Sequence, residues 1–252
     1  MTQYFLGQGK WYIATRDAAG NPKGLRWLLD TSSAKVSLKT TQIKQKESYS
    51  GQRGIVKNIT LDKECTIDLV LQELSKANLS LALFGKSLDI AGGTVTGEAL
   101  PDGLVAGDRV ALKYPKVSNL VLTDSAAAPA TVDPSKYKLD PDYGAIDMKD
   151  VANLTLPLKA AYKYDALEQV AIFANIPEDV FLRYEGINLA EDGAPIIVEL
   201  YRVKTEPLKE LVLISDNKLA DMTVSGSVQI DTTKPADCDL GRFGRIVQSK
   251  RS

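Results

Sequence analysis

The sequence predicts a mostly β protein: a β-sandwich or barrel with one flanking α-helix at about residues 75–84 and a β-rich insertion. Two patterns predict this fold. Along most of the chain apolar and polar residues alternate with a period of two, the spacing of a strand with one buried face. Only one segment has a clear helical spacing, and many short strands with one helix pack naturally as a sandwich or barrel.

The first strands are expected in the N-terminal third. Residues 11–15 and 25–29 are short strand candidates, separated by the turn-rich run 17–24. Residues 36–43 alternate over a longer stretch, which predicts a strand with one exposed face. The run 44–54 is polar and contains two glycines, so we expect an extended loop there.

A strand and the helix follow. The strand places alternate apolar side chains on one face: Cys65, Ile67, Leu69 and Leu71. Ser75 can cap the helix by accepting a hydrogen bond from a backbone N–H of its first turn. Leu79, Ala82 and Leu83 share one helical face, so the helix is expected to lie on a sheet. Gly85 fits the left-handed position after the last turn.

Residues 91–150 differ in texture, because glycines and prolines interrupt them at short intervals. Short strands fit between these breaks. We therefore expect a single domain over residues 1–252, with a β-rich insertion or subdomain at about 91–150.

The last hundred residues return to strand patterns. Residues 167–176 fit either a second helix or a strand. The other strand candidates are 180–184, 196–203, and a final hairpin formed by 208–214 and 219–231.

The formal charge of −1 hides a gradient. Residues 1–60 carry ten basic and three acidic side chains, 61–150 carry nine and fourteen, and 151–252 carry twelve and fifteen. This distribution argues against a nucleic-acid binder that is basic throughout. Either the positive part of one copy faces a negative part of another, or loops of both signs simply lie in solvent.

Composition also argues against catalysis. The chain has no histidine, which removes histidine-based triads, histidine metal sites and the commonest general base. Of the two cysteines, Cys65 is expected to be a buried thiol and Cys238 to be exposed. Asp140 and Asp142 flank a proline in what reads as an ordinary turn. We expect no catalytic residue, no cofactor and no metal site. We also expect no membrane span, since no segment approaches about 20 apolar residues.

The basic segment 35–57 allows three interpretations. It carries six cations but a single aromatic residue, Tyr49, which is too few for a nucleic-acid stacking platform. A solvated strand edge with its loop is the second interpretation, and a protein–protein arm is the third.

Seven runs in a fixed order carry a resemblance. They are Gly-Gln-Gly-Lys-Trp-Tyr-Ile-Ala at 7–14, Arg-Asp-x-x-Gly at 16–20, Glu-Ser-Tyr-Ser-Gly-Gln-Arg at 47–53, Leu-Ala-Leu-Phe-Gly at 81–85, Val-Glu-Leu-Tyr-Arg-Val at 198–203, Lys-Glu-Leu-Val-Leu-Ile at 209–214 and Gly-Arg-Phe-Gly-Arg-Ile at 241–246. In this order the chain resembles the major tail tube proteins of long-tailed bacteriophages. The likeness spans most of the chain and is weakest over 91–150.

The resemblance implies a β-sandwich or barrel of the phage tail tube type. It implies hexameric rings that stack head to tail into a hollow tube through which the genome is ejected. The implied partners are further copies of the chain, a tail tip or baseplate initiator, a tape measure protein and a tail terminator, with phage DNA passing transiently and without specificity. The implied location is the virion tail, with assembly in the host cytoplasm.

We expect the loop at 44–54 to contact the next ring, because it is long and basic and emerges from a long strand. Its proposed contact residues are Lys44, Lys46, Glu47, Tyr49, Gln52 and Arg53. A passive loop is the alternative. The tube interior is expected to be acidic or neutral, since cations there would grip the phosphates of DNA.

Three other functions remain open on the sequence. The chain could be a baseplate or decoration protein of the virion, or a component of a type VI secretion tube. The least favoured is a carboxylate-based hydrolase, because its two carboxylates could lie far apart in the sequence.

Overall fold

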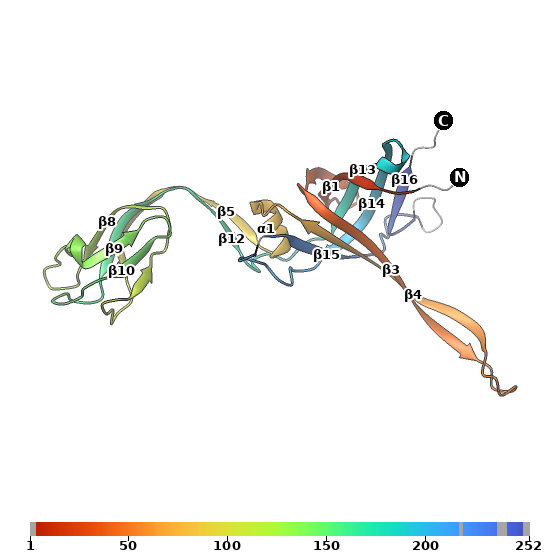
Figure 1. Cartoon of the computed structure of the whole chain (residues 1–252), viewed down its shortest axis with the longest axis horizontal. Coiled ribbons are helices and arrows are strands. Elements are labelled where there is room, and N and C mark those ends of the chain that lie inside the picture. Colours follow the sequence, from red (N-terminus) through yellow and green to blue (C-terminus); the bar gives the residue numbers. More distant parts are fainter. Residues whose placement is uncertain (1–3, 217–218, 236–240, 249–252) are drawn as a thin grey trace. The chain divides into compact units, whose positions relative to one another are not determined.

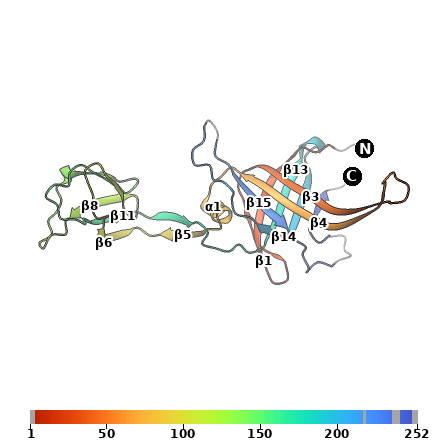
Figure 2. The same cartoon turned by 90° about the horizontal axis from the view of Figure 1, so that it is seen from below.

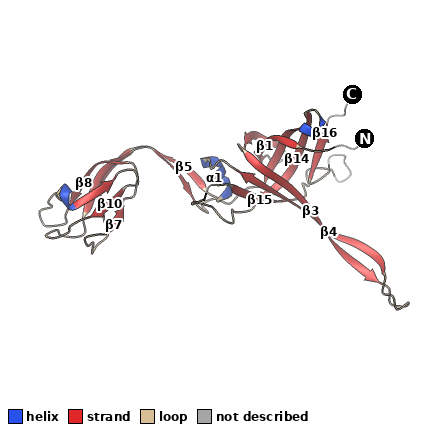
Figure 3. Cartoon of the chain, in the orientation of Figure 1, coloured by secondary structure: helices blue, strands red, loops and turns tan. Residues whose placement is uncertain are grey.

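Over the residues that the structure describes, the chain is mostly β, with one α-helix and several antiparallel sheets (Figure 3). The computed structural model describes residues 4–216, 219–235 and 241–248. It divides into two compact units. The main unit comprises residues 1–87 and 170–252, and the inserted unit comprises residues 88–169. The inserted unit thus contains the glycine- and proline-rich stretch 91–150 and extends beyond it at both ends.

The main unit is built on one eight-stranded sheet in the order β2-β1-β13-β14-β15-β4-β3, with β16 paired to β14 (Figure 1). Every pairing in it is antiparallel. Its strands are β1 (Gly7–Arg16), β2 (Pro22–Trp27), β3 (Thr31–Lys46), β4 (Ile55–Leu71), β13 (Val180–Asn188), β14 (Ala194–Thr205), β15 (Met222–Val228) and β16 (Gly244–Gln248).

This sheet curls around its own core. Ile13 of β1, Leu182 of β13 and Leu69 of β4 line one small internal space, although three strands separate β1 from β4 in the sheet. A flat sheet would hold these side chains too far apart. The predicted alternation in β4 is confirmed, because the apolar set at 65, 67, 69 and 71 is buried in this core.

The predicted flanking helix is confirmed as α1 (Lys76–Ala82), which lies at one end of the curled sheet (Figure 2). The hydroxyl of Ser75 accepts a hydrogen bond from the Asn78 N–H at 3.3 Å and so caps it. The prediction that Gly85 takes the left-handed position after the helix is wrong, because Phe84 adopts that conformation, with φ of 48°. Gly85 is instead a close-packing position, because a Cβ there would lie 2.6 Å from Cγ1 of Val170.

The inserted unit packs two three-stranded antiparallel sheets face to face, in the orders β6-β11-β8 and β7-β10-β9. Ile146 of one sheet and Leu122 and Tyr162 of the other meet in its core. Its strands are β6 (Gly93–Ala99), β7 (Arg109–Ala111), β8 (Val117–Thr123), β9 (Tyr137–Asp140), β10 (Ala145–Met148) and β11 (Lys159–Tyr164). A two-stranded ribbon of β5 (Lys86–Ile90) and β12 (Leu167–Ala171) carries the chain in and out.

Two expectations for the C-terminal part change. Residues 167–176 resolve in favour of a strand, β12. The predicted hairpin of 208–214 with 219–231 is wrong: residues 208–214 form no strand, and β15 pairs with β4 and β14 instead. The apolar run at 211–214 resembles a strand in composition, but it forms no strand in the structure.

Candidate assembly surface

Strands β3 and β4 continue beyond the rest of the sheet as a two-stranded ribbon, residues 39–64, which we call the arm (Figure 1). The two strands pair from Thr31 opposite Leu71 to Lys46 opposite Ile55. Strand β15 accompanies β4 only as far as Cys65, which lies opposite Val228. Past that point each strand of the arm has only the other as its partner.

The arm has no core of its own. Every residue in it is exposed except Glu47, which is half-buried. The expected strand at 36–43 is part of β3, but the expectation of one buried face is wrong, because both faces are exposed. The arm nevertheless carries large exposed apolar side chains, namely Ile43, Tyr49, Ile55, Val56, Ile59 and Leu61. An isolated two-stranded hairpin is at best marginally stable in water, and such apolar exposure is typical of a surface that a partner covers.

Two β-bulges shape the arm. The register shifts between Thr41 and Gln42 and again between Gln45 and Lys46, so that Leu61 and Val56 are the extra residues on β4. Each bulge leaves one residue of β4 without an opposite residue and increases the local twist. The bulges therefore turn apolar side chains out of the regular alternation of the ribbon.

The tip of the arm is a closed turn. The Glu47 N–H donates to the carbonyl of Gly54 at 2.9 Å, and the Glu47 carboxylate accepts from the hydroxyl of Ser50. Gly51 and Arg53 take positive φ values, 79° and 54°, which the tight reversal requires.

The predicted contact residues gather at the outer end of the arm, with one correction. Lys44 and Lys46 belong to strand β3, so the loop begins at residue 47 and not at 44. Strand β3 extends this far because Lys44 and Gln45 still lie opposite residues of β4, namely Asn58 and Lys57. The remaining four predicted residues, Glu47, Tyr49, Gln52 and Arg53, lie in the turn.

The outer end of the arm is positively charged. Residues 43–58 hold four cations, Lys44, Lys46, Arg53 and Lys57, against the single carboxylate of Glu47. Within the described ranges none of these four cations forms an ion pair. At the base of the arm, by contrast, Lys39 pairs with Glu64 at 3.3 Å. Charge is thus left uncompensated at the tip, where apolar side chains are also exposed.

The sheet leaves a second open feature that the sequence did not indicate. β2 and β3 are the outermost strands of the sheet's main path, and an open groove runs between the starts of β1 and β3. Trp11 and Tyr184 reach its floor, with ring centroids 5.3 Å apart. An edge strand exposes unpaired N–H and C=O groups, which a neighbouring chain can satisfy.

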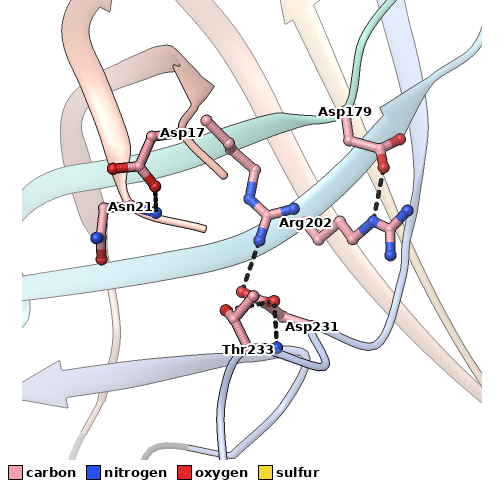
Figure 4. Close-up of polar contacts among 7 residues, drawn as sticks. Asp17, Asn21, Asp179, Arg202, Asp231 and Thr233 are labelled. Atoms are coloured by element: carbon pink, nitrogen blue, oxygen red, sulfur yellow. Dashed lines mark hydrogen bonds and ion pairs between the residues drawn. The ribbon is translucent and has the colours of Figure 1, made fainter. Parts of the chain in front are cut away.

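The polar clusters of the main unit tie strands and turns together (Figure 4). Asp231 accepts hydrogen bonds from the hydroxyl and N–H of Thr233 and lies 2.8 Å from the guanidinium of Arg16. Burial raises the pKa of Asp231, but the hydrogen bonds from Thr233 and the charge of Arg16 lower it by more. The net pKa therefore lies below the ordinary value. Arg202 donates to Asp179 at 2.6 Å, and Asp17 accepts from the Asn21 N–H at 2.8 Å.

A second cluster crosses three strands. Glu199 of β14 is buried between Arg183 of β13 and Arg245 of β16, which lie directly opposite it in the two ladders. The Arg245–Glu199 contact is 2.6 Å. Both oxygens of this carboxylate are engaged by guanidinium groups, so it holds β16 on the sheet.

The remaining candidates from the sequence occupy structural positions. Cys65 is buried and free, and burial raises the pKa of its thiol. Cys238 lies outside the described residues. Asp140 accepts from Arg109 at 2.7 Å, and Asp142 pairs with Lys116 at 2.7 Å. Across the described ranges no three histidine, cysteine or acidic side chains form a group that could hold a metal, and no helix is long and apolar enough to cross a membrane.

Comparison with known proteins gives one result. No curated protein matches the chain. A sequence model of a protein family, described as a protein of unknown function, UCP028589, matches residues 4–247. That match spans both units, and the chain belongs to this family.

Proposed function

We propose that the chain is a structural virion protein whose copies close into hexameric rings and stack into the hollow tail tube of a long-tailed phage. The observation that carries the proposal is the arm: a ribbon without a core, with exposed apolar side chains and unpaired cations at its tip. A monomer gains nothing from such an element. A second copy that covers it would bury the apolar residues and neutralise the charge.

A tube needs two kinds of contact from one chain. Contacts that close produce a ring, and head-to-tail contacts that do not close produce a filament. The exposed edges of β2 and β3 suit the first kind, because strand edges pair readily with a neighbour. The arm suits the second kind, because it projects past the sheet and can reach another ring.

The resemblance to major tail tube proteins supports the same function on separate grounds. In this proposal the partners are the copies themselves, a tail tip or baseplate initiator, a tape measure protein and a tail terminator. The lumen is acidic or neutral, so that DNA passes without being held.

Negative-stain electron microscopy of the purified chain over a range of concentrations, with light scattering alongside, tests the proposal. Hollow tubes or six-fold rings support it. A chain that stays monomeric at the highest attainable concentration, and also in the presence of a tail-tip initiator complex, contradicts it. Binding of single copies to preformed capsids or tails would favour a decoration protein instead.

A further inference from the structure

The end of the main unit that carries α1 has a second exposed surface, formed by residues 172–178 and 206–216, which we call the α1-end surface. Two backbone hydrogen bonds hold it to the end of the helix. The Phe173 N–H donates to the carbonyl of Leu83 at 3.1 Å, and the Leu208 N–H donates to the carbonyl of Ala82 at 2.8 Å. Both segments belong to the main unit and lie beside α1.

This surface is strongly apolar. Ile176, Leu213 and Ile214 are 87%, 82% and 94% exposed, and Ile172 and Phe173 are also largely exposed. In the run 211–214 the side chains of Val212, Leu213 and Ile214 are exposed, and Leu211 is half-buried. Several largely exposed apolar side chains at one end of a domain are typical of an interaction surface.

The charge of the α1-end surface is opposite to that of the arm. Residues 172–178 and 206–216 contain four carboxylates and one cation: Glu178, Glu206, Glu210, Asp216 and Lys209. All four carboxylate residues are exposed. The outer end of the arm has the reverse composition, four cations and one carboxylate, again with exposed apolar side chains.

Strand β4 separates the two surfaces within one copy. The arm tip precedes Ile55 at its start, and α1 follows Leu71 at its end. The strand has 17 residues, which is a length of about 55 Å at ~3.3 Å per residue. The arm therefore cannot fold back onto its own α1-end surface, and only another copy can bring the two together.

We propose that the α1-end surface is the docking site for the arm of a second copy of this chain. Arm and dock lie at opposite ends of β4, so each copy that receives an arm offers its own arm to the next one. Such a head-to-tail contact does not close and propagates along an axis. The inference rests on the proposed stacking of rings and identifies the surface that receives the arm.

Charge exchange tests the docking directly. One variant reverses the arm (Lys44→Glu, Lys46→Glu, Lys57→Glu), and another reverses the dock (Glu206→Lys, Glu210→Lys, Asp216→Lys). Each is expected to raise the protein concentration required for assembly about tenfold or more, because like charges then face each other. All six changes in one chain are expected to restore assembly. A control that reverses Lys138, Lys159 and Lys163 of the inserted unit should assemble as the unchanged protein does, and thermal melting confirms that every variant is folded.

A photoreactive side chain in place of Tyr49 identifies the receiving surface independently. Cross-links between copies should fall on residues 172–178 or 206–216. Two results would overturn the docking site and leave the tube proposal standing. One is a set of cross-links to another surface of a second copy, and the other is a variant with all six charge reversals that fails to assemble. An unchanged protein that forms no contact between copies would overturn both.

Discussion

Leu38 lies directly opposite Cys65 in the β3–β4 ladder, yet Leu38 is 80% exposed and Cys65 only 5%. The two side chains point to the same face, since opposite residues of an antiparallel pair do. Cys65 still has β15 on its other side, whereas Leu38 is on the edge of the sheet. This pair marks the place where the core ends and the arm begins. Beyond it the arm is held by two strands alone.

Removing the tip of the arm should separate folding from assembly. In the variant that replaces residues 47–54 by Asn-Gly, Lys46 and Ile55 stay opposite each other and a two-residue turn can close the shortened hairpin. Since the deleted residues bury almost nothing, the melting temperature of the main unit should stay unchanged. Assembly into tubes should be lost, as measured by light scattering and electron microscopy.

The matched control removes Ala127 and Ala128 from an exposed loop of the inserted unit. It should leave assembly intact if that loop has no contact with another copy. Tubes of normal length from the arm deletion would show that the arm is a passive loop.

Salt should weaken assembly. The cations of the arm tip are exposed, and charges in such positions are screened beyond about 8 Å at physiological ionic strength. Raising sodium chloride from about 0.05 M to about 0.5 M shortens the screening length further, so the concentration required for assembly should rise severalfold. Assembly that is independent of salt would mean that the apolar side chains alone form the contact.

The core face of the main unit could be predicted from the sequence, because it follows simple local rules. The alternation from Cys65 to Leu71 and the cap at Ser75 each depend on a few neighbouring residues. The long outer part of β4 could not be predicted. Its apolar residues Val56 and Leu61 are the extra residues of two bulges, which break the period of two that identifies a strand.

The candidate surface was only partly predictable for a related reason. The basic, glycine-containing run 44–54 indicates an exposed loop but not the ribbon that carries it, whose length depends on pairing between two distant segments. At 212–214 the apolar composition that is typical of a buried strand is exposed instead, although Leu208 of the same run packs against the core. An apolar composition indicates that a segment is more stable when covered. It does not indicate whether the covering surface belongs to the same copy or to another one.

Substitution of the buried Asn78 should destabilise the main unit. It is fully buried, its amide donates to the carbonyls of Leu28 and Glu73, and it accepts from Arg26 at 2.8 Å. In Asn78→Ala these groups lose their partner, so the free energy of unfolding should fall by about 2–3 kcal/mol. Urea unfolding followed by tryptophan fluorescence measures this, because both tryptophans, Trp11 and Trp27, are in the main unit.

The control for Asn78 is the exposed Asn58 of the arm, whose amide donates to Gln42. Asn58→Ala should change the free energy of unfolding by no more than about 0.5 kcal/mol. Equal effects of the two substitutions would contradict the role given to the buried amide.

The buried ion pair of Arg16 and Asp231 should appear in the pH dependence of stability. The pKa of Asp231 is lowered in the folded protein, so its ionised form stabilises the fold above the unfolded pKa of about 3.9. That contribution is lost as the pH falls through the lower folded pKa. Asp231→Asn should therefore destabilise the main unit by about 3 kcal/mol at neutral pH, and the difference from the unchanged protein should shrink below about pH 4.

Urea unfolding at a series of pH values, again by tryptophan fluorescence, gives this comparison. The exposed Asp62 of the arm provides the matched variant, and Asp62→Asn should alter stability by less than about 0.5 kcal/mol at neutral pH. A difference between Asp231→Asn and the unchanged protein that stays constant into acid would show that the ion pair does not set the acid stability.

A helical reconstruction of the assembled chain by electron cryomicroscopy tests the central claim most directly. The account predicts rings of six copies stacked along one axis, with the arm of every copy lying on the α1-end surface of a copy in the adjacent ring. Assemblies in which the arm at residues 39–64 stays free in solvent, or an unchanged chain that forms no ring under any condition, would contradict it.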